Sequence, residues 1–170
     1  IAFDKAQIET ALRHARLDQL PHQSDRKPLV ERKPHGALRG FVAFEPGEQF
    51  PSPTPIGPYS HIAKVGQFIT IGGTAGFDPA TGEIAGHDVY TQAKRILQSF
   101  DVMLRSVGSD LGHVIHVNVF LKDMHDFAEM NRAYVDMMGA HRPARTVVGV
   151  NELPKPGVLL TMNLTAVTVD

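Results

Sequence analysis

The chain has 170 residues, of which 42% are hydrophobic and 21% charged, enough for one domain with a sizeable core but too few for two ordinary domains. Its lack of cysteine excludes disulfides, zinc–thiolate sites and cysteine nucleophiles. No run approaches the roughly 20 apolar residues of a membrane span and no signal-peptide core lies near the start, so we expect a cytoplasmic protein without a membrane partner.

The charge divides the chain near residue 40. Residues 1–40 carry eight Lys/Arg and five Asp/Glu, a net +3, whereas residues 41–170 carry nine Lys/Arg and thirteen Asp/Glu, a net −4. We therefore predict an N-terminal extension over 1–40 and a single domain over 41–170. The acidic balance of that domain is a poor match to the phosphate backbone, so nucleic-acid binding is not expected.

The extension is predicted to hold a short helix followed by an arm. Asp4 and Gln7 form a capping pattern, and Ile8, Leu12 and Ala15 recur at helical spacing as far as Leu20. Residues 22–36 are polar, contain two prolines and show no periodicity. A first residue of Ile rather than Met is compatible with an internal piece of a longer protein.

From residue 40 the pattern alternates between strands and helices. A long helix is predicted over Val89–Val107, with apolar residues at helical spacing and a stop at Gly108, and a second helix over Asp126–Met138. The predicted strands are Gly40–Phe44, Tyr59–Val65, Phe68–Gly72, His113–Leu121, Thr146–Val150 and Val158–Val169.

This order predicts an α+β fold in which two helices pack on one face of a mixed sheet. In the strand His113–Leu121, the uniformly aliphatic set is expected to be buried: Ile115, Val117, Val119 and Leu121. The other face of the sheet still needs a cover, which favours an oligomer.

Several motifs occur together in one order and spacing. They are Ile56-Gly57-Pro58-Tyr59-Ser60-His61, Gly73 with Gly76-Phe77-Asp78-Pro79 and Thr81-Gly82-Glu83, Phe120-Leu121-Lys122-Asp123-Met124, Asp126-Phe127 with Met130-Asn131 and Tyr134, Arg142-Pro143-Ala144-Arg145, and Leu153-Pro154. In these motifs, residues 41–170 resemble the RidA/YjgF family, also called the L-PSP endoribonuclease family. The resemblance implies a chorismate-mutase-like fold and a homotrimer with three clefts between neighbouring subunits. It also implies hydrolysis of reactive enamines or imines to 2-keto acids and ammonia. It does not extend to residues 1–40.

The resemblance also assigns the binding residues. Arg145 matches the carboxylate-binding arginine, whose guanidinium can meet a carboxylate with two parallel hydrogen bonds; the alternative is a surface salt bridge. Gly73 and Val147 match positions that offer backbone N–H groups to the ligand, although Gly73 could simply mark a strand bulge. Tyr59 would form an aromatic wall and Asn131 would hold water or polar substrate atoms, with a packed tyrosine and a helix-surface asparagine as the alternatives.

Three positions depart from the family. If residues 166–169 are aligned with the family's last strand, Asn163 stands where deaminating members have a catalytic Glu. Asn can hydrogen-bond a water but is no base near neutral pH. Gly72 stands where a Ser is usual, and Thr74 where Gln is common. The residues expected to bind the carboxylate are kept, whereas the residue expected to transfer protons is replaced.

Other constellations do not indicate a site. On a strand, the spacing of His113 and His116 puts the two side chains on opposite faces, so no metal pair is expected. His125, Asp123 and Asp126 flank a helix start, where capping is the simpler role. No Gly-rich phosphate loop or serine nucleophile elbow is present, and we expect no cofactor.

Three functions remain open. The first is an enzyme that hydrolyses a carboxylate-bearing imine or enamine, and the second is a non-catalytic or regulatory member that binds a small acid in the same clefts. A carboxylate substituting at the site, such as Glu152 from a neighbouring chain, would favour the enzyme. The third function, an endoribonuclease, is disfavoured by the acidic domain.

Overall fold

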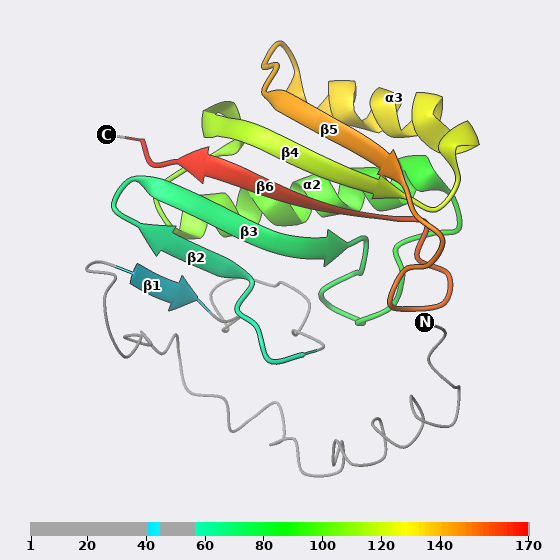
Figure 1. The fold of residues 1–170 in the computed structure, drawn as a ribbon, viewed down its shortest axis with the longest axis horizontal. Coiled ribbons are helices and arrows are strands. Elements are labelled where there is room, and N and C mark those ends of the chain that lie inside the picture. Colours follow the sequence, from blue (N-terminus) through cyan, green and yellow to red (C-terminus); the bar gives the residue numbers. More distant parts are fainter. Residues whose placement is uncertain (1–40, 45–56, 170) are drawn as a thin grey trace.

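The computed structural model describes residues 41–44 and 57–169, and Figure 1 shows their arrangement. The helix and arm predicted within residues 1–40 lie outside the described residues, as do residues 45–56 of the proline-rich turn region. None of the helices in the described part of the chain combines the length and the apolar character that crossing a membrane would require.

Six strands form one mixed sheet in the order β1-β2-β3-β6-β4-β5. Neighbouring strands are antiparallel except for β4 and β5, which run parallel. Strand β5 therefore forms one edge of the sheet, and two strands separate it from β3. The strands are β1 (Phe41–Phe44), β2 (Ile62–Val65), β3 (Phe68–Ala75), β4 (Val114–Leu121), β5 (Ala144–Gly149) and β6 (Leu160–Val167).

Helix α2 spans Val89–Ser106, as the apolar spacing predicts. Its start is fixed by Asp88, whose side chain accepts a hydrogen bond from the backbone N–H of Thr91 at 2.8 Å. It ends before Gly108, which adopts a φ of +80° that other residues rarely accept. The stop predicted at Gly108 is thus confirmed.

Helix α3 spans Phe127–Met138 and follows a short 3₁₀ turn over Met124–Asp126. The side chain of Asp123 begins this turn by accepting the backbone N–H of His125 at 2.9 Å. Another 3₁₀ turn, over Leu111–His113, leads into β4. Both long helices lie on the same face of the sheet (Figure 1). The predicted α+β arrangement is confirmed.

The core lies between the sheet and these two helices. Strand β6 shows the alternation most clearly, because every second residue from Leu160 to Ala166 is buried and the residues between them are only half-buried. Helix α2 and the residue that caps its C-terminus supply the opposing apolar stripe, in which seven predicted residues are all buried: Ala93, Ile96, Leu97, Phe100, Met103, Leu104 and Val107.

One predicted core residue is wrong. Ile115 is 44% exposed, whereas Val114 beside it is buried together with Val117, Val119 and Leu121. The register between β4 and β6 shifts between Val114 and His116, so strict alternation fails at the start of the strand.

Some strand limits also differ from the prediction. Strand β2 begins three residues late, because Tyr59 donates its backbone N–H to the carbonyl of Gly57 in a turn. Strand β3 runs on to Ala75. Strand β6 spans Leu160–Val167 rather than Val158–Val169, so it is two residues shorter than predicted at each end.

Candidate functional site

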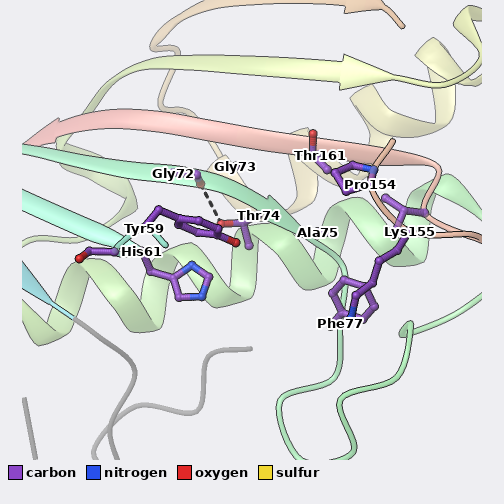
Figure 2. Close-up of a pocket in the computed structure, with 12 residues that line it drawn as sticks. Tyr59, His61, Gly72, Gly73, Thr74, Ala75, Phe77, Pro154, Lys155 and Thr161 are labelled. Atoms are coloured by element: carbon purple, nitrogen blue, oxygen red, sulfur yellow. Dashed lines mark hydrogen bonds between the residues drawn. The ribbon is translucent and has the colours of Figure 1, made fainter. Parts of the chain in front are cut away.

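A pocket of about 450 Å³ opens beside the end of β3 and the start of β6 (Figure 2). This volume falls in the range of small-molecule sites. Four of the predicted binding residues lie around it: Tyr59, Gly72, Gly73 and Thr74. The lining consists of Tyr59, Ser60, His61, Gly72, Gly73, Thr74, Ala75, Phe77, Pro154, Lys155, Val158 and Thr161.

The two glycines of the pocket form a bulge in β3. Ile71 pairs with Leu164 and Thr74 with Met162, so Gly72 and Gly73 together oppose the single residue Asn163. The bulge considered for Gly73 is therefore present, and it exposes the backbone inside the pocket. A Cβ at Gly73 would meet nothing within 4 Å, so a side chain there would extend into open space. The hydroxyl of Thr74 donates to the carbonyl of Gly72 at 3.0 Å.

Aromatic rings stand at both ends of the pocket (Figure 2). At one end the rings of Tyr59 and His61 meet edge to face, with their centroids 5.7 Å apart. At the other end the ammonium group of Lys155 lies 4.7 Å from the centre of the Phe77 ring. The pocket is thus largely apolar, with a cation at the end opposite Tyr59.

A buried glutamine holds one wall of the pocket in place. Gln92 of α2 donates from Nε2 to the carbonyls of Gly86 and Gly157, each at 3.0 Å, and its Oε1 accepts the backbone N–H of Leu159 at 2.9 Å. The segment that carries Pro154 and Lys155 is thereby tied to the helix layer.

Arg145 lies elsewhere, on the edge strand β5. Its guanidinium carbon is 4.6 Å from the centre of the Tyr134 ring and 5.9 Å from that of Phe127, and one of its nitrogens is 3.9 Å from the sulfur of Met130. Within the described part of the chain Arg145 forms no ion pair. The alternative of a surface salt bridge therefore has no support among the described residues.

The hydroxyl of Tyr134 is buried and has no hydrogen-bond partner within the described residues. Burial raises the pKa of this phenol, and the nearby guanidinium groups of Arg145 and Arg142 offset the rise only in part. Tyr134 is therefore neutral near pH 7. It presents an aromatic face to Arg145 and leaves the charge of the guanidinium uncompensated.

Asn131 and Val147 belong to the same region as Arg145. Phe127, Asn131 and Tyr134 lie on one side of α3, because residues three or four apart share a helix face. Val147 follows Arg145 by two residues on β5, so both side chains point toward the helices. We call Phe127, Asn131, Tyr134, Arg145 and Val147 the arginine cluster.

Asn163 belongs to neither group. Its Oδ1 accepts a hydrogen bond from Nδ2 of Asn118 at 2.8 Å, across the pair formed by β6 and β4. Its backbone lies opposite the bulge at Gly72 and Gly73, but its side chain does not line the pocket.

Several lining residues had no role assigned from the sequence. Phe77, Ser60, His61 and Pro154 stood inside the motifs, whereas Lys155 and Thr161 did not. The signal that could have found Thr161 is strand alternation, because it shares a sheet face with Asn163 two residues away. Among the described residues no three His, Asp or Glu side chains converge as metal ligands would.

Comparison with known proteins identifies the family. The sequence model described as endoribonuclease L-PSP matches residues 50–168. The chain belongs to this family, which is also called the RidA/YjgF family.

The family has relatives in distant organisms. A RutC family protein of Pyrococcus abyssi is 44% identical over 115 residues, which cover 68% of this chain and 90% of the relative. A protein of Mus musculus named 2-iminobutanoate/2-iminopropanoate deaminase is 35% identical over 104 residues, 61% of this chain and 77% of the mouse protein. The crystal structure of the YjgF gene product of E. coli superposes with a TM-score of 0.65 at 33% identity, covering 69% of this chain and 93% of the other.

Proposed function

We propose that this RidA/YjgF protein hydrolyses a small imine or enamine that carries a carboxylate, releasing a 2-keto acid and ammonia. The observation that carries the proposal is Arg145, a half-buried guanidinium that aromatic rings hold without an acidic partner among the described residues. Such a group binds a carboxylate with two parallel hydrogen bonds. Relatives that are named deaminases support the reaction.

The complete site is proposed to lie between subunits. Three steps across the sheet separate β5 from β3, which at roughly 4.8 Å per step is about 14 Å. A ligand of a few carbon atoms cannot span this distance and contact Arg145 and Gly73 of one chain. A second copy that places its β5 edge beside the pocket would complete the site, in agreement with the homotrimer that the resemblance implies.

In this assembly Arg145 and the backbone of Val147 grip the carboxylate from one subunit, with Asn131 beside them. Tyr59 and the bulge at Gly73 enclose the reacting end from the other subunit. Gly72 and Thr74 shape the same wall, and Thr74 is held by its hydrogen bond to the bulge.

A non-catalytic, small-acid-binding role is the second candidate, and one observation favours it. None of the residues that line the pocket within the described part of the chain is Asp or Glu, so the pocket residues of this chain supply no carboxylate base. Ribonuclease activity has less support, because residues 41–170 carry a net charge of −4. The cytoplasmic location stays a prediction.

The experiment is to generate 2-iminobutanoate in situ with an amino-acid oxidase and to follow the release of 2-oxobutanoate with and without the protein. The proposal expects acceleration, together with binding of 2-oxobutanoate. Binding without acceleration would favour the non-catalytic role, and absence of both would refute the site.

Mixing two inactive variants tests the subunit boundary. Arg145→Ala lacks the carboxylate grip, and Gly73→Leu fills the pocket of its own chain. After co-refolding at equal amounts, about a quarter of the clefts in a cyclic oligomer combine an intact arginine with an intact pocket. Activity near that fraction is expected. A site within one chain would restore none.

A further inference from the structure

Thr161 is a polar residue of β6 that lines the pocket. Thr161 pairs with Ala75, and both residues line the pocket on the sheet face that the helices leave uncovered. The next residue on that face, Asn163, has its side-chain oxygen bound by Asn118 at 2.8 Å and does not line the pocket.

The extent of β6 does not decide between Thr161 and Asn163. The alignment that assigned Asn163 to the position of the catalytic Glu ran the last strand through Val169, whereas β6 spans Leu160–Val167 and is two residues shorter than predicted at each end. An alignment displaced by two residues keeps the same sheet face, because side chains alternate, and would place Thr161 at that position. The pocket therefore decides between the two residues, because Thr161 lines it and Asn163 does not.

We infer that Thr161 orients the attacking water in the reaction proposed above, and that Asn163 supports the sheet through Asn118. This inference rests on the proposed function. A threonine hydroxyl has one donor and two acceptor sites, so it can hold a water against a planar C=N group. It is not a base near neutral pH, so it orients the water without taking its proton.

The reaction balances without a base from the protein. The water oxygen bonds to the imine carbon, the C=N electron pair moves to nitrogen, and the water proton reaches that nitrogen through solvent. The hydroxyl proton of the carbinolamine then reaches the amino nitrogen through solvent, the C–N bond breaks to release ammonia, and the hydroxyl oxygen becomes the keto oxygen. Thr161 holds the water in position, and solvent transfers the protons.

The test compares four variants with the wild type in the imine assay, with kcat and KM determined separately. Thr161→Val keeps the shape and removes the hydroxyl, and it is expected to lower kcat about tenfold, the effect of one neutral hydrogen bond, with KM nearly unchanged. Thr161→Ser should restore kcat. Thr161→Glu should raise kcat by on the order of 10²-fold, the low end for general acid–base catalysis, and by more than Asn163→Glu does.

The outcomes separate the two proposals. A wild type that hydrolyses the imine while Thr161→Val keeps full kcat would overturn the role of Thr161 and leave the function standing. A larger gain from Asn163→Glu than from Thr161→Glu would do the same. Wild type and variants that all bind 2-oxobutanoate without turnover would refute the hydrolysis itself. If Thr161→Glu fails to fold, the Val and Ser variants alone decide the matter.

Discussion

Replacing Arg145 with Ala is the sharpest perturbation of the proposed site. Removing one partner of a buried, hydrogen-bonded charge pair costs about 2–5 kcal/mol, and the half-buried setting of Arg145 places it near the lower end, about 2–3 kcal/mol. At about 1.4 kcal/mol per tenfold change, the Kd for 2-oxobutanoate should rise roughly 30- to 150-fold. Calorimetric titration at constant ionic strength measures this directly.

Two further variants make the result specific. Arg145→Lys should recover only part of the affinity, because an ammonium is a point charge without the planar fork of a guanidinium. Arg105→Ala removes the same charge from the exposed end of α2, where Arg105 pairs with Asp101 at 2.9 Å, and should leave the Kd unchanged. Equal losses in Arg145→Ala and Arg105→Ala would mean that net charge, rather than the arginine cluster, governs binding.

Substitutions at three other positions probe the support of the site. Tyr134→Phe keeps the ring beside Arg145 and removes the buried hydroxyl. Urea unfolding of this variant should show a free energy of unfolding that is equal or higher by up to about 1 kcal/mol, and its Kd should be retained. Tyr134→Leu removes the ring and should weaken binding by about 1–2 kcal/mol. Gln92→Leu removes three hydrogen bonds to backbone groups that hold the pocket wall, and it should lower the free energy of unfolding by about 2–4 kcal/mol in the same assay. Unaltered stability would contradict this role. Asp88→Ala should cost about 1 kcal/mol at pH 7. The Thr91 hydrogen bonds hold the pKa of Asp88 below its ordinary 3.8, so this stabilisation is present above pH 4 and fades as the pH falls through the lowered pKa; a gap that stays constant down to pH 2 would argue against a charged cap.

The helices and most of the core could be predicted because their signals are local. A capping Asp88, apolar residues at helical spacing and a terminating Gly108 all lie within one short segment, and each acts through the chain next to it. Ile115 shows the limit of this reasoning. Its exposure follows from a register shift against β6, a strand about 50 residues away in the sequence. No residue next to Ile115 in the sequence indicates that shift.

The site was harder to predict than the fold because its residues come together only through the sheet. The motifs named Arg145 and Gly73 individually, but the strand order puts them on strands that two others separate. That order depends on pairings between β3, β6 and β4, which are long-range in sequence. The division into a pocket and an arginine cluster therefore could not be anticipated from composition or periodicity.

Position along β6 illustrates why a fold tolerates an error that a site does not. A two-residue shift of the strand leaves every side chain on its original face, so the prediction of the core is unaffected. The same shift moves a chosen side chain by about 7 Å along the sheet, which is the width of a small substrate. Thr161 lines the pocket and Asn163 does not, although both satisfy the same alternation. A catalytic assignment on a strand therefore needs the position along the strand as well as the face, and here the pocket supplies that position.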